Sequence, residues 1–238
     1  MGQKFARKKK RILINTIIYK LSKFIWASER AKFEFFANRE WIFNRLALES
    51  WMTMYADKEQ HPRRESMHAF ICDKLPDGAA VLDIGCGFGE ISGMLGKVCK
   101  SVVGIDLDRP KLQHALDHYS SDSVTFICGD ALAFLEENQQ HYDVLVCSHI
   151  LEHLDDPSGM LRRFKEYFSY IYIEVPDFDN SHINLVRQRL NIRLNYTDDD
   201  HVQEYDRNEM AMLITSLNMK IAHVEFRYGV MRYWVKVE

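Results

Sequence analysis

The stretch Val81–Glu90, VLDIGCGFGE, constrains the fold of this chain more than any other feature of its sequence. A short, mostly apolar run leads into Gly85, Gly87 and Gly89, after which an amphipathic segment begins. Glycine takes backbone conformations with positive φ and lets main-chain N–H groups approach a ligand closely. The pattern predicts a buried parallel strand, a tight glycine turn and the start of a helix. A dinucleotide fingerprint needs a sixth-position glycine, where this chain has Glu90.

Strand-like and helix-like patterns alternate along the chain from residue 61. Short apolar runs bounded by turn residues predict seven strands, at Ala80–Ile84, Ser101–Asp106, Val124–Cys128, Tyr142–Cys147, Tyr170–Val175, Lys220–Arg227 and Tyr233–Val237. Helical spacing and capping residues predict helices at Arg63–Leu75, Ser158–Phe168 and Arg207–Leu217. Such alternation is typical of an α/β fold. We therefore expect a doubly wound, seven-stranded and mostly parallel sheet with a C-terminal antiparallel hairpin.

The sequence predicts that residues 1–60 form a helical extension of a domain that spans residues 61–238. Residues 1–32 carry ten Lys or Arg and one acid, a balance of +9, whereas the remainder carries 21 basic and 33 acidic residues, a balance of −12. Apolar residues from Ile12 to Ile25 recur at helical spacing behind the basic cluster Arg7–Arg11, and residues 29–58 are rich in aromatics. We expect a basic amphipathic helix that lies on an anionic membrane surface, or packs on the body instead, and aromatic-rich helices that cap the domain.

The charge distribution and the cysteines limit the partners and the compartment. An acidic body repels phosphates, so we expect no nucleic-acid partner. The five cysteines show no C-x-x-C spacing and mostly lie in apolar runs, which indicates reduced, buried thiols. No apolar run has the length of a membrane span, and no secretion signal is evident. The prediction is a cytoplasmic protein, with peripheral attachment at the inner face of a membrane as an option.

Four motifs in sequence carry a family resemblance: VLDIGCGFGE, VVGIDLD, VTFICGDAL and YDVLVCSHILEHLDDP. Residues from about 79 to 228 resemble the class I S-adenosylmethionine-dependent methyltransferases, closest in pattern to the ubiquinone-biosynthesis-like and type 11 small-molecule groups. The resemblance implies a Rossmann-like methyltransferase fold and S-adenosylmethionine as cofactor. It also implies a set of cofactor-binding residues that match the family's motifs, namely Asp83, Gly85, Cys86, Gly87, Asp106, Leu107, Asp130, Ala131 and Cys147.

Three acids in that set have family roles and simpler alternatives. Asp106, 21 residues beyond Gly85, stands where the family accepts hydrogen bonds from two ribose hydroxyls. Asp130 matches the acid that accepts from the adenine amino group, and Asp83 matches the acid near the methionine end. The alternatives are turn capping for Asp106 and Asp130, and ordering of the glycine loop for Asp83.

Three histidines are candidates for the chemistry. His149 and His153 follow the fourth strand, where open α/β sheets bind ligands and the family places its substrate chemistry. His201 lies in DDDHVQEY, which resembles the family's H-V-x-x-Y/F stretch, in an insertion around residues 177–206 that we expect to form a substrate lid. A hydroxyl acceptor needs a general base of near-neutral pKa, the role we assign to these histidines. Packing or local architecture is the alternative for each.

The string His149-x-x-Glu152-His153 also spells H-x-x-E-H. As a zinc-protease pattern it requires a long helix, whereas it stands here at a strand-to-turn junction. We therefore predict neither a protease nor a metal. The alternative is a divalent cation on His149, Glu152 and His153, with His182 or His201 as a further ligand, because some methyltransferases with E-x-x-E-H at this place bind one.

The resemblance and these residues together predict the reaction. We expect a methyltransferase that acts on a hydroxyl of a small molecule or a glycan, and the basic leader favours a membrane-proximal acceptor such as a lipid-linked saccharide or an isoprenoid precursor. Methylation of nucleic-acid amines is not expected, because Cys147–Ile150 stands in place of the (Asp/Asn)-Pro-Pro-(Tyr/Phe) motif of those enzymes. The alternatives are an N- or carboxyl-methyltransferase on the same fold and a catalytically silent partner protein.

Overall fold

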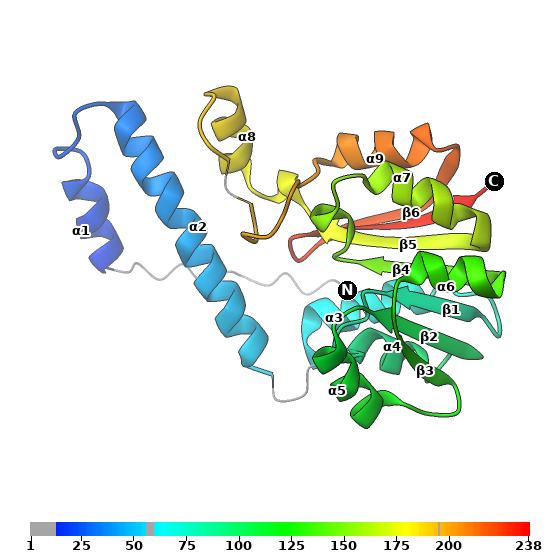
Figure 1. Ribbon diagram of the computed structural model, residues 1–238. Coiled ribbons are helices and arrows are strands. Elements are labelled where there is room, and N and C mark those ends of the chain that lie inside the picture. The colour runs from blue at the N-terminus through cyan, green and yellow to red at the C-terminus, as the bar shows by residue number, and fades with distance from the viewer. Residues whose placement is uncertain (1–12, 56–59, 195) are drawn as a thin grey trace, which may run out of the picture. The chain divides into compact units, whose positions relative to one another are not determined.

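The computed structural model describes residues 13–55, 60–194 and 196–238 (Figure 1). The chain forms two compact units, of which the first ends at Ala47 and the second runs from Leu48 to Glu238. Along the chain, the boundary between the two units falls within the sequence of one long helix, α2 (Glu29–Thr53). The predicted division into a 1–60 extension and a 61–238 domain stays a prediction.

Seven strands of the second unit form one sheet in the order β3-β2-β1-β4-β5-β7-β6 (Figure 1). The strands are β1 (Ala80–Ile84), β2 (Ser101–Asp106), β3 (Val124–Cys128), β4 (Tyr142–Ser148), β5 (Phe168–Pro176), β6 (Met219–Arg227) and β7 (Val230–Val237). The first five pair in parallel, and β7 runs antiparallel to both β5 and β6. The predicted seven-stranded sheet with its C-terminal hairpin is confirmed. Strand order reverses between β1 and β4, which is where such sheets open a crevice for ligands.

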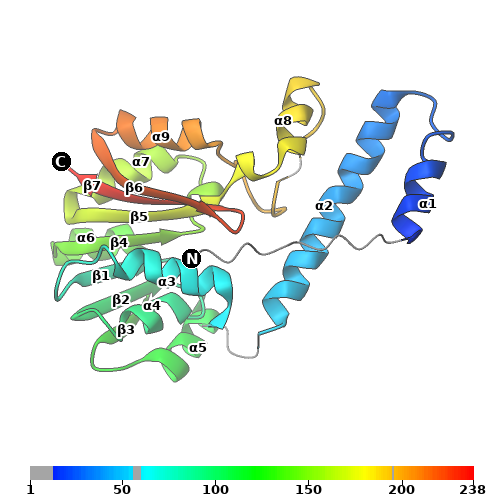
Figure 2. The same ribbon diagram turned by 180° about the vertical axis from the view of Figure 1, so that it is seen from behind.

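Helices cover both faces of this sheet. Figure 1 shows α6 and α7 on the near face, and Figure 2 shows α3 and α4 on the other. The helices of the second unit are α3 (Pro62–Cys72), α4 (Glu90–Leu95), α5 (Arg109–Tyr119), α6 (Ala131–Asn138), α7 (Pro157–Phe164), α8 (His182–Arg189) and α9 (Arg207–Ser216), with 3₁₀ turns at Leu151–His153, Lys165–Tyr167 and Phe178–Asn180. One apolar core lies between the strands and α6, α7 and α9, and a second lies between the strands and α3 and α4. The alternation of strand side chains between the two cores fixes which residues face each layer.

Several predicted boundaries differ from the structure by one to four residues, and two of the differences have a clear physical reason. The helix expected to reach Phe168 ends at Phe164, because a 3₁₀ turn follows and Phe168 is buried as the first residue of β5. The last strand begins at Val230 rather than Tyr233. Tyr228 and Gly229 both have positive φ (55° and 77°), the geometry of a two-residue hairpin turn, which lets pairing with β6 start at once.

The first unit is helical. Helix α1 (Leu13–Leu21) is followed by a turn and then by α2, whose 25 residues form one continuous helix where several were expected. Trp26, in the segment between the two helices, packs its ring against the rings of Phe35 and Phe36 on α2. The basic cluster at residues 7–11 lies outside the described residues, and the capping role of the aromatic segment stays a prediction. Among the described helices, none is both long and apolar enough to cross a bilayer.

Candidate functional site

The glycine turn after β1 is built for close approach. Gly85, Gly87 and Gly89 have φ of 60°, 55° and 82°, a region that other residues enter only with strain. A Cβ at Gly89 would lie 2.6 Å from the Cβ and 3.1 Å from the Cα of Ala115 on α5, whereas one at Gly87 would meet nothing within 4 Å. The absence of a side chain at Gly89 therefore lets the turn pack closely against α5. At Gly87 it leaves the backbone accessible beside the end of β1.

Asp106 at the end of β2 holds this turn in place. Its Oδ2 accepts a hydrogen bond of 2.7 Å from the backbone N–H of Gly87, and its Oδ1 accepts one of 2.8 Å from that of Asp108. A carboxylate has about four acceptor positions, so two remain for a ligand. Asp106 is therefore both the local cap that we named as the alternative and an acceptor that faces open space.

A cavity of about 510 Å³ lies at the carboxyl ends of β1, β2 and β3, a size that suits a small-molecule ligand. Five of the nine predicted cofactor residues line it: Gly85, Asp106, Leu107, Asp130 and Ala131. Asp130 also caps α6, where its Oδ1 accepts from the Ala133 N–H at 2.8 Å. The other four predicted residues, Asp83, Cys86, Gly87 and Cys147, do not line this cavity.

Sequence reasoning missed the opposite wall of this cavity. It is formed by Ile150 and Leu154 after β4 and by Met160 and Phe164 on α7. These side chains are apolar residues of ordinary helical spacing, so only the N-cap Asp156 with the following proline indicated that α7 begins beside the site. A ligand here is enclosed between polar groups at the strand ends and an apolar helix face.

Asp83 is buried beneath the glycine turn, on the opposite face of β1 from Leu82 and Ile84. Its Oδ2 accepts a hydrogen bond of 2.6 Å from the Ser92 hydroxyl on α4. Burial raises the pKa of Asp83 to about 7, and the Asp106 carboxylate acts in the same direction while the Ser92 hydrogen bond opposes it. Asp83 is thus a carboxyl group whose charge is finely balanced near neutral pH.

His149 ends β4 in a strained conformation and lies between two carboxylates. Its φ is 55°, its Nδ1 lies 2.7 Å from Glu152 Oε1, and its Nε2 lies 3.3 Å from Glu174 Oε1 and close to the Arg63 guanidinium. Burial disfavours the charged ring, but hydrogen bonds to the two carboxylates outweigh it and raise the pKa of His149. Because Glu152, Glu174 and Arg63 engage both ring nitrogens, His149 has no free lone pair to accept a proton from a substrate. This geometry suits positioning of Glu152, and the assignment of His149 as the base stays a prediction.

A buried ionic network centred on Glu174 contacts His149. Glu174 on β5 accepts hydrogen bonds from Arg232 Nε at 2.5 Å and from the Tyr172 hydroxyl at 2.9 Å, and it pairs with Arg63 at 3.4 Å. Arg232 on β7 is fully buried and also pairs with Glu225 Oε2 at 2.6 Å. Burial alone would raise the pKa of Glu174, but His149 and the two arginines hold it well below its usual range. Sequence reasoning missed this network, although a glutamate inside the apolar run YIYIEV was a signal of a buried ion pair.

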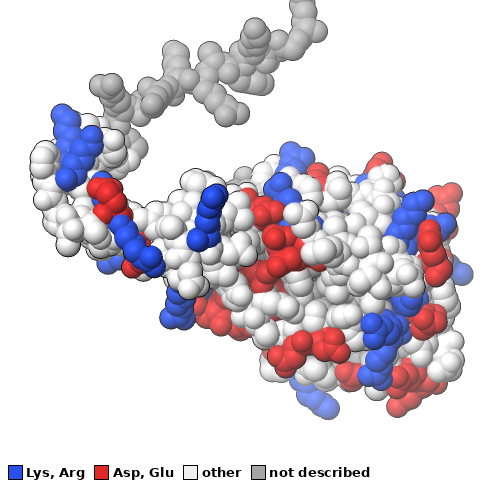
Figure 3. Space-filling model, turned by 90° about the horizontal axis from the view of Figure 1, so that it is seen from above, with Lys and Arg blue, Asp and Glu red and all other residues white. Residues whose placement is uncertain are grey.

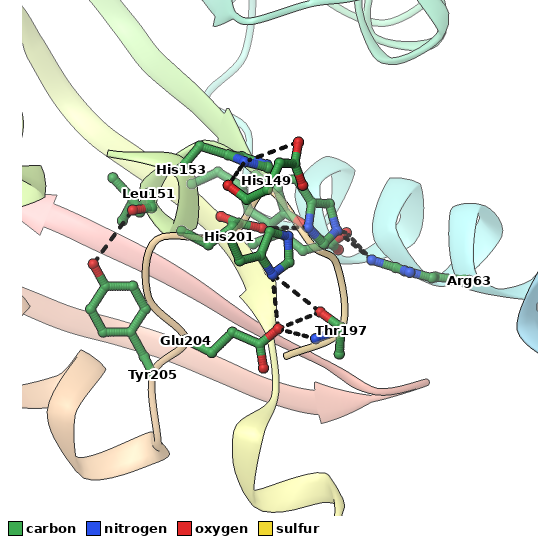
Figure 4. A network of polar contacts seen from close by, with 12 residues as sticks. Arg63, His149, Leu151, His153, Thr197, His201, Glu204 and Tyr205 are labelled. Carbon is green, nitrogen blue, oxygen red and sulfur yellow. Dashed lines mark hydrogen bonds and ion pairs between the residues drawn. The ribbon is translucent and has the colours of Figure 1, made fainter. Parts of the chain in front are cut away.

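His153 and His201 lie beside this network (Figure 4), and Glu152 converges with them. The rings of His153 and His201 meet edge to face at 4.9 Å, and one ligand atom of each of the three residues lies within 4.8 Å of the others. Glu152 is fully buried, and its Oε2 has no hydrogen-bond partner among the described residues. His201 Nδ1 lies 2.8 Å from Glu204 Oε1, and donation of a hydrogen bond from Nδ1 to this carboxylate leaves the lone pair of Nε2 available to a proton or a ligand. Glu204 was not predicted from the sequence.

This group differs in one residue from the divalent-cation site that the sequence offered as an alternative, which had His149, Glu152 and His153 as its ligands. The structure brings His201 to Glu152 and His153, while His149 is held by the two glutamates; His182, at the start of α8, is not part of the group. Two nitrogens and a carboxylate are a ligand set that suits several divalent ions. His149 on Glu152 and Glu204 on His201 supply the outer hydrogen bonds that orient such ligands.

The insertion between β5 and α9 brings His201 to this place. The backbone N–H groups of Val202 and Gln203 both donate to the Glu152 carbonyl, at 2.9 and 3.2 Å, and the Gln203 side chain donates to the Leu154 carbonyl at 3.0 Å. Arg187 on α8 is almost fully buried and donates to the Arg193 carbonyl at 2.8 Å, so its guanidinium holds the insertion together. The role of the insertion as a lid stays a prediction.

Comparisons with known proteins identify the family and the fold of this chain. Residues 56–224 match the family described as "Methyltransferase domain". The ubiquinone biosynthesis O-methyltransferase of Shewanella sp. (strain ANA-3) is 34% identical over 89 residues, 36% of this chain and 37% of that protein. The mitochondrial enzyme of the same name from Saccharomyces cerevisiae is 34% identical over 113 residues, 44% of this chain and 34% of that protein. The matched segments thus span little more than a third of these relatives.

Solved structures show the same fold at low sequence identity. Magnesium protoporphyrin IX methyltransferase from Synechocystis PCC 6803, with bound S-adenosylhomocysteine (SAH), has a TM-score of 0.59 and 17% identity, and the match covers 82% of this chain and 96% of that one. The small RNA methyltransferase HEN1 has a TM-score of 0.56 and 18% identity, over 74% of this chain and 25% of that one. At these identities the likeness concerns the fold.

Proposed function

This chain belongs to the methyltransferase domain family, and on that premise we propose that it transfers the methyl group of S-adenosylmethionine to a hydroxyl of a small molecule or a glycan. The observation that carries the proposal is the convergence of Glu152, His153 and His201 just past β4, with the ligand cavity at the neighbouring strand ends. The O-methyltransferase relatives support a hydroxyl acceptor over an amine.

The residues of the cavity fit the cofactor. The free acceptor positions of Asp106 suit two ribose hydroxyls, and Asp130 suits an amino group. Gly87 lies outside the lining of the cavity, but its open side leaves room for part of a ligand against the backbone. The apolar wall of α7 suits a flat base. S-adenosylmethionine supplies a methyl group on a positively charged sulfur, so the protein has to align the acceptor and exclude water rather than provide a covalent intermediate.

His201 is the best-placed general base of the three predicted histidines. Its Nδ1 hydrogen bond to Glu204 leaves Nε2 to take the acceptor's proton, and the resulting imidazolium is stabilised by the Glu204 carboxylate. His153 has a weaker version of the same arrangement, with Nδ1 3.4 Å from the Asp200 carbonyl. Removal of this proton turns the hydroxyl into a nucleophile at the moment of transfer.

A divalent cation on Glu152, His153 and His201 is a second candidate mechanism, favoured by the unpartnered and buried Glu152 Oε2. Such an ion would lower the pKa of an acceptor hydroxyl without a protein base. Calorimetric titration of the full chain with Mn²⁺ tests it. We expect binding that Glu152→Gln abolishes and that Glu136→Gln, at an exposed position, leaves intact; absence of binding to the wild type would leave the histidine mechanism alone.

The finer proposal concerns the acceptor and its location. We place the protein in the cytoplasm, with an acceptor near the inner face of a membrane, such as a lipid-linked saccharide or an isoprenoid precursor. The support is the basic composition of residues 1–32 against an acidic body. An N- or carboxyl-methyltransferase would instead tolerate His201→Ala and His153→Ala with little loss of rate, because such acceptors need no base.

The test combines a binding measurement with a search for the product. SAH should bind the wild type in calorimetry, and Asp106→Ala should weaken it, whereas Asp117→Ala at an exposed position should not. Lipid and glycan fractions of cells lacking the gene should contain a species one methyl group lighter, which the wild type restores and His201→Ala does not. A protein that fails to bind SAH would be a silent member of the fold, and a methylated nitrogen would overturn the hydroxyl assignment.

A further inference from the structure

Helix α1 presents its apolar side to solvent. None of its nine residues is buried. The exposed apolar residues of the helix and of the turn after it are Leu13, Ile14, Ile17, Ile18, Leu21, Phe24 and Ile25, from 48% to 87% exposed. Exposed apolar residues in such a contiguous group are unusual on a soluble surface and mark an interaction site.

The apolar and polar residues of this segment separate cleanly. At about 100° per residue, the five apolar residues of α1 (Leu13, Ile14, Ile17, Ile18 and Leu21) fall within an arc of roughly 140°, and Phe24 and Ile25 follow in the turn. Asn15, Thr16, Tyr19 and Lys20 occupy the opposite side of the helix. The separation is wider than the narrow seam of a coiled coil, and it matches the profile of a helix that lies in a planar interface.

The charge of the same region has one sign. Residues 1–28 contain eight Lys or Arg and no acid. Lys20 and Lys23 belong to the described part, and Figure 3 shows blue side chains beside a white area on the N-terminal helices, with red side chains close by; α2 carries acids such as Glu29 and Glu34. Lys23 also lies over the Tyr19 ring, 4.8 Å from its centroid, a pairing of cation and aromatic ring that suits a headgroup region.

We propose that α1 and the following turn dock flat on an anionic lipid surface, with the apolar side at the acyl boundary and the lysines among the headgroups. A nucleic acid would satisfy the lysines but leave the apolar side in water. A helix of nine residues is too short to cross the bilayer, so it lies on the surface. This inference rests on the N-terminal helix alone and holds whatever the acceptor of the catalytic unit.

Co-sedimentation of the full chain with vesicles tests the proposal. One set consists of phosphatidylcholine and the other contains about 30% phosphatidylglycerol, since anionic lipid attracts each nearby Lys or Arg severalfold. The wild type should sediment with the anionic vesicles, less so as salt rises, and not with the neutral ones. Failure to sediment with anionic vesicles, or equal sedimentation with both, would overturn it.

Two variants that add the same charge on opposite sides of α1 separate the apolar contribution. Ile17→Asp places it on the apolar side and Asn15→Asp on the polar side. Because a buried isoleucine side chain changes partitioning by about tenfold or more, Ile17→Asp should bind at least about tenfold more weakly than Asn15→Asp. Equal binding of the two variants would contradict the proposal. So would a dimer, seen without vesicles by sedimentation velocity, that Ile17→Asp dissociates, since the occupant would then be a second copy. Circular dichroism should confirm that both variants fold like the wild type.

Discussion

The buried carboxyl group of Asp83 makes the stability of the ligand-free protein depend on pH in a specific direction. Its ordinary pKa is 3.8, and its pKa in the folded protein is about 7. As pH rises above 3.8, the unfolded chain releases this proton first, so the native state loses stability progressively until about pH 7 and no further above it. A gap of about 3 pKa units, at 1.36 kcal/mol each, corresponds to a penalty of about 4 kcal/mol at pH 8.

Asp83→Asn removes the titration and keeps an acceptor for the Ser92 hydroxyl. We therefore expect the free energy of unfolding of the variant, relative to the wild type, to improve by about 2–3 kcal/mol between pH 5 and pH 8. Urea unfolding without ligand at both pH values measures this difference, and Asp122→Asn, at an exposed position, gives the baseline. A difference that does not change with pH would refute the reasoning, because Asp83 would then be ionised in the folded protein throughout this range.

Three further predictions concern the glycine turn, the ionic network and the cavity. Gly87→Ala should lower the free energy of unfolding by about 1 kcal/mol but abolish SAH binding in calorimetry. Gly89→Ala should lower it by at least about 2 kcal/mol more, because the added Cβ meets the backbone of α5, and thermal unfolding measures the difference between the two variants. Glu174→Gln should cost about 3–5 kcal/mol in urea unfolding, because it leaves the buried charge of Arg232 poorly compensated; a loss below 1 kcal/mol would contradict the network. Asp106→Asn should weaken SAH binding by about tenfold, as expected for the loss of charge-assisted hydrogen bonds, with an unchanged circular dichroism spectrum.

The sheet could be predicted closely because its strands are short apolar runs bounded by polar turns. β1, β2 and β3 begin and end at the predicted residues. The prediction was wrong where local pattern and tertiary structure disagree. Lys165–Tyr167 continue a helical pattern, but Phe168 is needed in the sheet beside Tyr142, and the chain turns early to deliver it.

The candidate site divides in the same way. The motifs of the family resemblance led to Asp106 and Asp130, which stand at or just past the end of strands whose positions the sequence marks, and both line the cavity. Nothing local could reveal the contact of Glu174 with Arg63 and Arg232, since 111 and 58 residues separate these partners and only the sheet order brings them together. The same holds for His201 and Glu152, which meet through the course of the insertion.

The anchor of that insertion has an evolutionary consequence. Two backbone N–H groups hold one backbone carbonyl, so these two hydrogen bonds do not depend on which side chains Val202 and Gln203 carry, while the Gln203 side chain adds a third hydrogen bond, to the Leu154 carbonyl. Residues along the insertion can therefore be replaced without breaking the two backbone hydrogen bonds that hold the loop beside Glu152. In the proposed role of the insertion as a lid, such replacements would change the acceptor while the residues that line the cavity at the strand ends stay the same.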